Sequence, residues 1–366
     1  MKKTKQMKTA LFYKTVIILL LVPAFIFANS GKLTGKHTKE KKLHKEYEVN
    51  STATVKIDNS YGNIDIVTWN ENRVVIDVTI TTNGNNEDKV IKKLDGIDVI
   101  FDNSTNMVSA KTKFNNNKSW WNWGNNNVNM KINYVIKMPM SNNVDLENDY
   151  GSINLDKLEG RAEIDCDYGK ITTKELMADN NVLSFDYTKN SYFEYIKSGR
   201  IDADYSGYTV GKTNNLSIDA DYSKSNIEIA EDVTYDCDYG SLTVGKANNV
   251  KGDGDYLTLR LGDIYKNVTV NADYGSMKID NMTSNAGNIN VTSDYMKITI
   301  GYSEGYSFNF DIDLSYGSLR DTDGFEFSKK NVKSRSKYYT GYYGNSGSGN
   351  NINIESDYGS VTFKKN

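Results

Sequence analysis

The sequence predicts an all-β protein: a right-handed, single-stranded parallel β-helix (β-solenoid) with coils of about 18 residues, closed at its N-terminal end by a β-rich cap that contains one short helix. Three observations lead to this fold. A tyrosine-centred motif recurs at near-constant intervals, apolar and polar residues alternate strictly within each repeat, and the repeats show no helical periodicity.

The repeat is Asp-Tyr-Gly or a close variant, with steps of 17 to 21 residues between successive tyrosines. A unit of this size cannot enclose a core alone, so its copies must stack. A further copy at Tyr358 lies 42 residues after Tyr316, which predicts two steps with one motif lost and a loop at 337–349. The regularly spaced tyrosines are Tyr150, Tyr168, Tyr187, Tyr205, Tyr222, Tyr239, Tyr256, Tyr274, Tyr295 and Tyr316.

Within a unit, the segment 201–205 alternates apolar and polar residues, which is typical of a half-buried strand. We expect its inward column to hold an aliphatic residue, a small residue and then the tyrosine. A second alternating strand and an Asn-rich turn follow. Parallel stacking at roughly 4.8 Å and right-handed connections are expected. An antiparallel meander or sandwich is the alternative, but it would not need to repeat the same order in every unit.

Cys166 and Cys237 occupy the small inward place, four coils or roughly 19 Å apart. A disulfide needs Cα atoms within about 7 Å, so two buried, unpaired thiols are predicted. The other residues at the small place are Ala203, Ala220, Gly254 and Ala272.

Residues 47–140 are less regular and are predicted to be the N-terminal β cap, with the repeat region at 141–366. An early copy of the unit lies at 57–66, strands are expected at 74–81, 97–102, 107–113 and 128–137, and a short helix at 86–94. The insertion with Trp120, Trp121 and Trp123 is expected to fold over the cap as a hydrophobic plug; the alternative is an exposed contact for a sugar, a lipid surface or a protein.

The N-terminus predicts export. Lysines precede a short apolar run, so residues 1–28 are predicted to be a signal peptide cleaved after Ala28, with an uncleaved anchor as the alternative. Residues 29–46, which include His37 and His44, are predicted to be a basic flexible linker. The mature chain is therefore expected outside the cytoplasm, in the periplasm, at the outer surface or secreted, with no integral membrane segment.

Charge and composition argue against several function classes. Removing five signal-peptide lysines takes the net charge from −3 to −8, so nucleic acid is not an expected partner. Both histidines lie in the expected linker, and no nucleophile elbow, P-loop, dinucleotide fingerprint or paired-cysteine metal site occurs. We predict no enzyme activity, no catalytic, cofactor-binding or metal residues, and no cofactor. Carboxylate-only hydrolysis of polysaccharides remains the enzymatic alternative.

Aspartates recur in pairs along the repeat and are expected to point outward as a ladder. Solvent, salt and lysines are expected to relieve their repulsion, with Ca²⁺ binding left open as the alternative. The central members are Asp202, Asp204, Asp219, Asp221, Asp236 and Asp238.

The entry strand and turn 59–66, the helix-like 88–94, the strand into 138–140 and units such as 150–155 resemble the adhesin families of exported bacterial proteins, in particular the DUF4097 type, related to the DUF2807 or head GIN adhesin domains. The resemblance covers nearly all of 47–363 and implies a parallel β-helix with a surface or adhesive role. The expected function is thus a non-enzymatic adhesin-like module whose acidic, Tyr-rich face binds a glycan or protein of a surface or matrix. A polysaccharide-active enzyme and a periplasmic accessory protein of an envelope signalling system are the alternatives.

Overall fold

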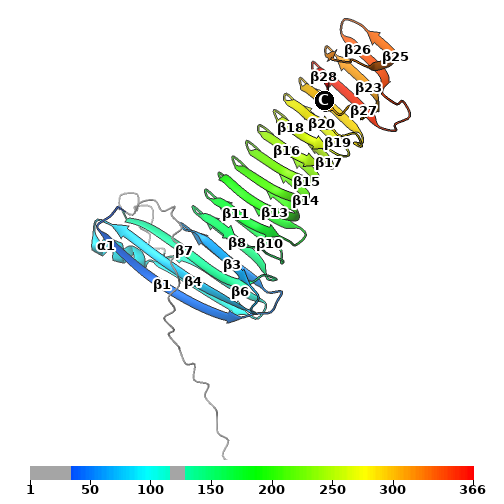
Figure 1. Ribbon diagram of the computed structural model, residues 1–366. Helices are drawn as coiled ribbons and strands as arrows, with labels where there is room; N and C mark the ends of the chain where they lie inside the picture. The colour runs from blue at the N-terminus through cyan, green and yellow to red at the C-terminus, as the bar shows by residue number, and fades with distance from the viewer. Residues whose placement is uncertain (1–33, 116–127) are drawn as a thin grey trace, which may run out of the picture.

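The protein is a rod of stacked strands joined to a broader N-terminal region (Figure 1). The computed structural model describes residues 34–115 and 128–366, so the predicted signal peptide and the Trp120, Trp121 and Trp123 loop lie outside the described residues. Among the described residues the chain is mostly β-strand with the one helix α1 (Glu87–Asp95). The all-β class is confirmed, and the stacking is consistent with a β-solenoid.

The rod consists of two files of parallel strands that meet at a corner. In spatial order, the first file contains β2 (Thr54–Ser60), β8 (Asn143–Asp149), β10 (Ala162–Asp167), β12 (Asn181–Ser184), the ends of β13 (Lys189–Asp202), β14 (Gly207–Asp219) and β15 (Lys224–Asp236), then β17 (Asn249–Asp253), β19 (Val268–Asp273), β21 (Ile289–Asp294), β27 (Asn351–Asp357) and β23 (Phe308–Ser315). The second file contains β3 (Ile64–Trp69), β9 (Ser152–Leu155), β11 (Lys170–Leu176), the beginnings of β13 to β15, β16 (Ser241–Ala247), β18 (Thr258–Ile264), β20 (Ser276–Met282), β22 (Lys297–Tyr302), β28 (Ser360–Lys365) and β24 (Ser318–Arg320).

The core lies between the two files and follows the predicted alternation. Ile201 and Ile218 are neighbours in the pairing of β13 with β14, and both are buried. Cys166 and Cys237 are buried and unpaired, as predicted. Burial raises the pKa of each thiol to about 12, so both stay protonated at neutral pH and act as small core residues.

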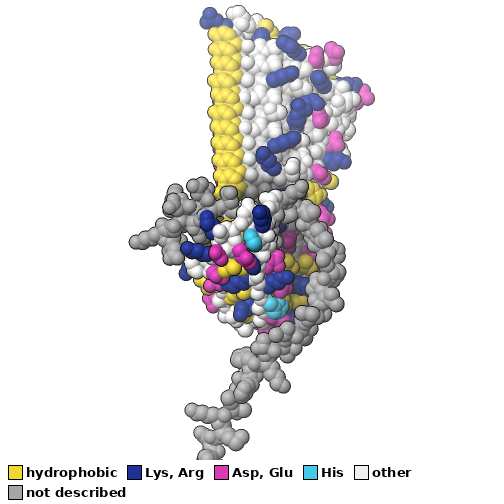
Figure 2. Space-filling view, turned by 90° about the vertical axis from the view of Figure 1, so that its left-hand side faces the viewer, with side chains coloured by type: hydrophobic (Ala, Val, Ile, Leu, Met, Phe, Trp, Pro, Cys, Tyr) yellow, Lys and Arg dark blue, Asp and Glu magenta, His cyan; other side chains and the backbone are white. Residues whose placement is uncertain are grey.

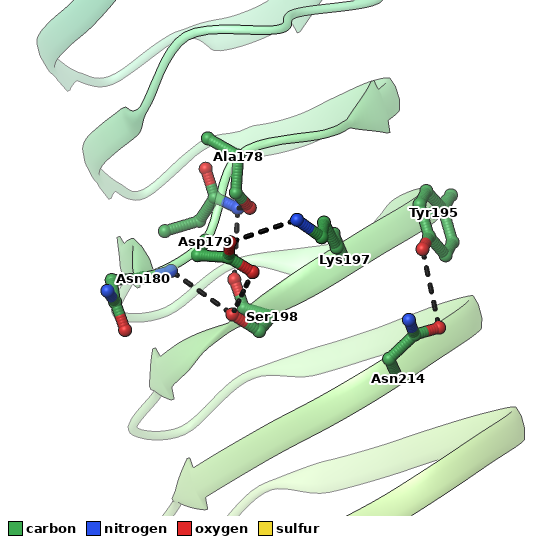
Figure 3. A network of polar contacts seen from close by, with 8 residues as sticks. Ala178, Asp179, Asn180, Tyr195, Lys197, Ser198 and Asn214 are labelled. Carbon is green, nitrogen blue, oxygen red and sulfur yellow. Dashed lines mark hydrogen bonds and ion pairs between the residues drawn. The ribbon is translucent and has the colours of Figure 1, made fainter.

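Side-chain hydrogen bonds hold the turns that lead back into the first file. At the turn between β11 and β12, Asp179 accepts a bond from the Lys197 ammonium at 2.9 Å and one from the Ser198 hydroxyl at 3.3 Å, while the Asn180 backbone N–H donates to the Ser198 oxygen (Figure 3). These bonds join one coil to the next, so this turn is held in place by residues of the following coil.

The N-terminal region extends both files of strands, because β7 (Val128–Pro139) pairs with β3 and β6 (Met107–Phe114) pairs with β2, and its further pairings are antiparallel. β1 (His37–Glu48) pairs antiparallel with β4 (Arg73–Gly84), and β4 pairs antiparallel with β7. The hairpin of β5 (Ile97–Ser104) and β6 attaches to β2. The predicted helix is confirmed, with the Asn86 side chain as its N-cap.

The prediction of a flexible linker at 29–46 is wrong from His37 onward, because these residues form β1. Leu43 and Tyr47 pack against the core, and Lys39, Lys41 and Lys45 alternate with them on the same face, where they contact α1 and β5. The Lys41 ammonium lies 2.7 Å from the Asp98 carboxylate. Lysines on an edge strand discourage pairing with other chains, so a basic composition here is compatible with a strand.

The C-terminal order of coils also differs from the prediction. β27 lies between β21 and β23, and β28 lies between β22 and β24, so the last 16 residues fill a place that the chain had skipped. The segment 337–349 is not a simple loop: β26 (Ser336–Tyr343) pairs antiparallel with both β23 and β25 (Phe325–Val332) and covers the end of the rod. This closing hairpin lies at the upper end of Figure 1.

Candidate interaction surface

Twelve tyrosines occupy the corner between the two files of strands. All twelve have a left-handed backbone, with φ between 51° and 64°. This conformation interrupts the alternation: the ring points outward, and the residue after the tyrosine takes the inward place, as Ser206 does. The prediction that these tyrosines point into the core is therefore wrong. Eleven of them are 47–54% exposed, and Tyr61 is half-buried.

The rings form one continuous stack, here called the tyrosine file. Successive centroids are 4.7–5.2 Å apart and ring planes differ by 9° or less, which is offset stacking. The prediction that the tyrosines lie in single file is confirmed. In spatial order the members are Tyr61, Tyr150, Tyr168, Tyr187, Tyr205, Tyr222, Tyr239, Tyr256, Tyr274, Tyr295, Tyr358 and Tyr316.

The tyrosine file is a straight apolar ridge along the rod (Figure 2). Eleven steps at the strand spacing make it roughly 50 Å long. Because each ring covers its neighbour's faces, the ridge exposes ring edges and hydroxyl groups. Loss of hydration, followed by the neighbouring rings, raises the pKa of Tyr168 and Tyr239, so these phenols remain neutral at physiological pH.

The aspartate that precedes a tyrosine has a structural role. The Tyr205 backbone N–H donates to the Asp221 carbonyl oxygen at 3.0 Å, and the Asp221 N–H donates to the Asp204 carboxylate at 3.2 Å. The same carboxylate-to-backbone bond recurs at Asp238 and Asp255. The inner member of each pair is therefore hydrogen-bonded rather than free, and these bonds offset part of the repulsion within the ladder.

The outer member of each pair is exposed on the face of the first file. Arg200 bridges two of these carboxylates, with its guanidinium 3.3 Å from Asp202 and 2.8 Å from Asp219. Over residues 34–115 and 128–366, no three His, Cys, Asp or Glu side chains are grouped so that they could hold a metal ion. His44, expected in a linker, instead contacts the Asp77 carboxylate at 2.6 Å in β4.

Asp165, on β10, lies among other carboxylates. Loss of hydration, followed by the charges of Asp167, Glu147 and Asp149, raises its pKa to about 6. An aspartate of the unfolded chain titrates near pH 3.9, so the folded protein binds this proton more tightly. The free energy of unfolding should thus increase as pH falls from 7 to 5, because protonation relieves the loss of hydration and the repulsion that the charged carboxylate meets only in the folded state.

This titration gives a pH prediction. The wild-type melting temperature should be a few degrees higher at pH 5 than at pH 7, measured by circular dichroism, and Asp165→Asn should remove much of the difference. Glu304→Gln is the control, because the Lys365 partner lowers the pKa of Glu304, so that its loss should leave the rise in place. A wild-type protein that is less stable at pH 5 would contradict the assignment.

A surface depression of about 620 Å³ lies between β20, β22 and the C-terminus. Its carboxylates are in ion pairs, Glu304 with Lys365 at 2.5 Å and Asp280 with Lys278. Glycoside hydrolysis needs one carboxyl group that holds its proton near neutral pH beside an ionised one. The Lys365 contact instead lowers the pKa of Glu304, which opposes that role.

Sequence reasoning found the tyrosines but missed their direction. The available signal was the small residue after each tyrosine, as in Tyr205-Ser206 and Tyr274-Gly275. When the tyrosine has a left-handed backbone, the next side chain points into the core at the corner, where only a small residue fits. Ser206 is buried, and its hydroxyl donates to the Phe185 carbonyl oxygen. An inward tyrosine would have left no place for Ser206.

No protein-family model matches the sequence, and no curated protein matches it. Similar solved structures are bacterial proteins provisionally described as adhesion proteins. One from Clostridium sporogenes has 15% identity over 90% of this chain and 100% of its own, with a TM-score of 0.19. One from Parabacteroides merdae has 10% identity over 88% and 96%, with a TM-score of 0.32, and one from Bacteroides fragilis has 14% over 89% and 97%, with a TM-score of 0.21. At these scores the likeness supports no argument about this chain.

In the described part of the chain, no helix has the length and apolar character that crossing a membrane requires.

Proposed function

We propose that this protein is an exported, non-enzymatic, adhesin-like module whose tyrosine file is its binding surface. A single observation carries the proposal: twelve tyrosines adopt a left-handed backbone that glycine or asparagine adopts at lower cost, and eleven of them remain about half-exposed. That conformation costs a residue with a side chain roughly 1 kcal/mol. Stacking offsets part of this cost, and a turn alone would not need an aromatic ring.

The proposal includes the organisation of the chain. A signal peptide at 1–28 directs it out of the cytoplasm, residues 47–140 form the N-terminal cap, and residues 141–366 wind as a right-handed β-helix of about 18-residue coils. The partner is a macromolecule at a surface or in a matrix, because a ridge roughly 50 Å long exceeds any small ligand.

The test is adhesion of beads that carry the full secreted chain to surfaces coated with the same protein, with other proteins or with polysaccharides. A triple variant with Tyr205→Asn, Tyr222→Asn and Tyr239→Asn keeps a residue suited to positive φ but removes three rings. Adhesion should fall at least tenfold. Tyr192→Asn with Tyr265→Asn is the matched control, because both tyrosines are exposed outside the file. Equal adhesion of the triple variant and wild type would refute the proposal.

A second candidate, a polysaccharide-active enzyme, is favoured by one observation. Asp165 has a pKa near 6 and lies near Asp167, which is the kind of pair that glycoside hydrolysis uses. Release of reducing sugar ends by the wild type, lost in Asp165→Asn, would favour this candidate over the adhesin. Its weakness is that Asp165 lies on the exposed outer face of β10.

A further inference from the structure

The tyrosine file restricts the chemistry of its partner. A sugar ring stacks on an aromatic face, but the faces along the file are covered by neighbouring rings at 4.7–5.2 Å. What remains is a ridge of ring edges and hydroxyls repeated at the strand spacing. A surface that fits such a ridge along its whole length must have the same spacing, as paired sheets do in steric zippers.

We propose that the partner is a second copy of this chain, and that two rods lie side by side and parallel with their tyrosine files in contact. This inference rests on the proposed role of the file as a binding surface. A second copy offers the same straight ridge with the same repeat, so every ring edge meets ring edges over the full length. Such a contact is isologous, which is the usual form of a two-fold dimer.

The exposed area is sufficient for a stable dimer. Eleven rings are about half-exposed, and a tyrosine buries up to about 200 Å² when it is fully covered. The file alone can thus contribute roughly 1,000 Å² per copy, compared with about 800 Å² per partner in a standard interface.

The two flanks of the file carry opposite charges. The acidic flank is the outer face of the first file of strands, where an aspartate precedes ten of the twelve tyrosines. The basic flank is the strip of the second file next to the tyrosines, which carries lysine or arginine two or four places after seven of them; Figure 2 shows basic side chains on the face beside the ridge. The basic residues nearest the file are Lys170, Lys189, Lys224, Arg260, Lys278, Lys297 and Arg320.

These charges select the orientation of the two rods. When two rods face each other in parallel, related by a two-fold axis along the rod, the acidic flank of each copy lies opposite the basic flank of the other. When the rods are antiparallel, acidic faces acidic and basic faces basic. Electrostatic complementarity therefore favours the parallel pair, and like-charge repulsion disfavours the other.

Sedimentation of the full secreted chain tests the pairing. Wild type should sediment as a dimer at micromolar concentration, and the triple Tyr→Asn variant at 205, 222 and 239 should raise the dimer dissociation constant at least tenfold. The Tyr192→Asn and Tyr265→Asn control should remain dimeric, with equal circular dichroism for all three proteins. A wild type that is monomeric at 100 µM would overturn the pairing. If beads carrying this monomeric wild type still adhered through the tyrosine file to surfaces coated with other molecules, the proposed adhesive function would stand without the dimer.

Oxidative cross-linking tests the orientation, and the buried Cys166 and Cys237 leave the surface free of competing thiols. In a parallel pair each tyrosine lies opposite its own copy, so Tyr168→Cys alone and Tyr295→Cys alone, at the third ring from each end of the file, should each give a linked dimer. In an antiparallel pair neither would link alone, whereas a mixture of the two would. Linked dimer only in the mixture would overturn the parallel arrangement.

Discussion

A chain that ends at Asn350 should lose the whole C-terminal end of the rod, not only its last coil. The deleted residues 351–366 pair on both sides, with β21 and β22 below them and β23 and β24 above. Their removal leaves a gap inside the stack and detaches β23 and its hairpin. It also removes four buried side chains, Ile352, Ile354, Val361 and Phe363, which together contribute at least about 5 kcal/mol.

Limited proteolysis and thermal unfolding measure this effect. Residues 303–350 should become sensitive to protease while the coils before Tyr295 stay protected, because a solenoid is stabilised by contacts between neighbours. A synthetic peptide of residues 351–366 should restore protection by filling the gap, and a scrambled peptide should not. Asn353→Ala, at an exposed position of β27, is the control and should behave as wild type. A truncated chain as resistant as the intact one would show that the last coil is dispensable.

The second large effect is expected at the aromatic cluster in the middle of the rod. Phe193 is fully buried, and its ring centroid lies 5.8 Å from that of Phe185 and 6.5 Å from that of Tyr208. Phe193→Ala should lower the free energy of unfolding by about 3–5 kcal/mol, because it removes apolar contacts and leaves a cavity between fixed coils.

Urea denaturation is the measurement for this variant. Tyr192→Ala is the matched control, since Tyr192 is the adjacent residue and its side chain is exposed. It should change stability by less than about 0.5 kcal/mol. A loss below about 1 kcal/mol would mean that the coils can close around the cavity.

The closing coil also bears on the binding surface. Tyr358 stacks between Tyr295 and Tyr316, at 4.7 and 4.8 Å. The tyrosine file is therefore continuous to the end of the rod only when the C-terminal residues are in place. Deletion of 351–366 should shorten the ridge as well as destabilise its end, whereas the tyrosine substitutions in the middle of the rod alter the ridge alone.

Local patterns determined much of this protein. The repeat interval, the period-two alternation and the small inward place predicted stacked parallel strands and two buried, unpaired cysteines, and the pattern at 86–94 predicted the helix. Each of these features depends on residues close together in sequence, or on the same short unit repeated. Periodicity records such features directly, since every coil meets the same constraints.

Tertiary structure alone decided three features: the outward tyrosine rings, the strand at 37–48 and the order of the last coils. One left-handed residue turns each ring outward, and a tyrosine suits either side of a strand, so the alternation could not reveal it. The lysine-rich strand forms because β4 offers a partner far along the chain. The interval of 42 residues is the same whether the chain advances two coils or returns to fill one, and only the pairing of β27 with both neighbours distinguishes them. Contacts between distant segments leave no local period in the sequence, which is the physical reason that these features required the folded structure.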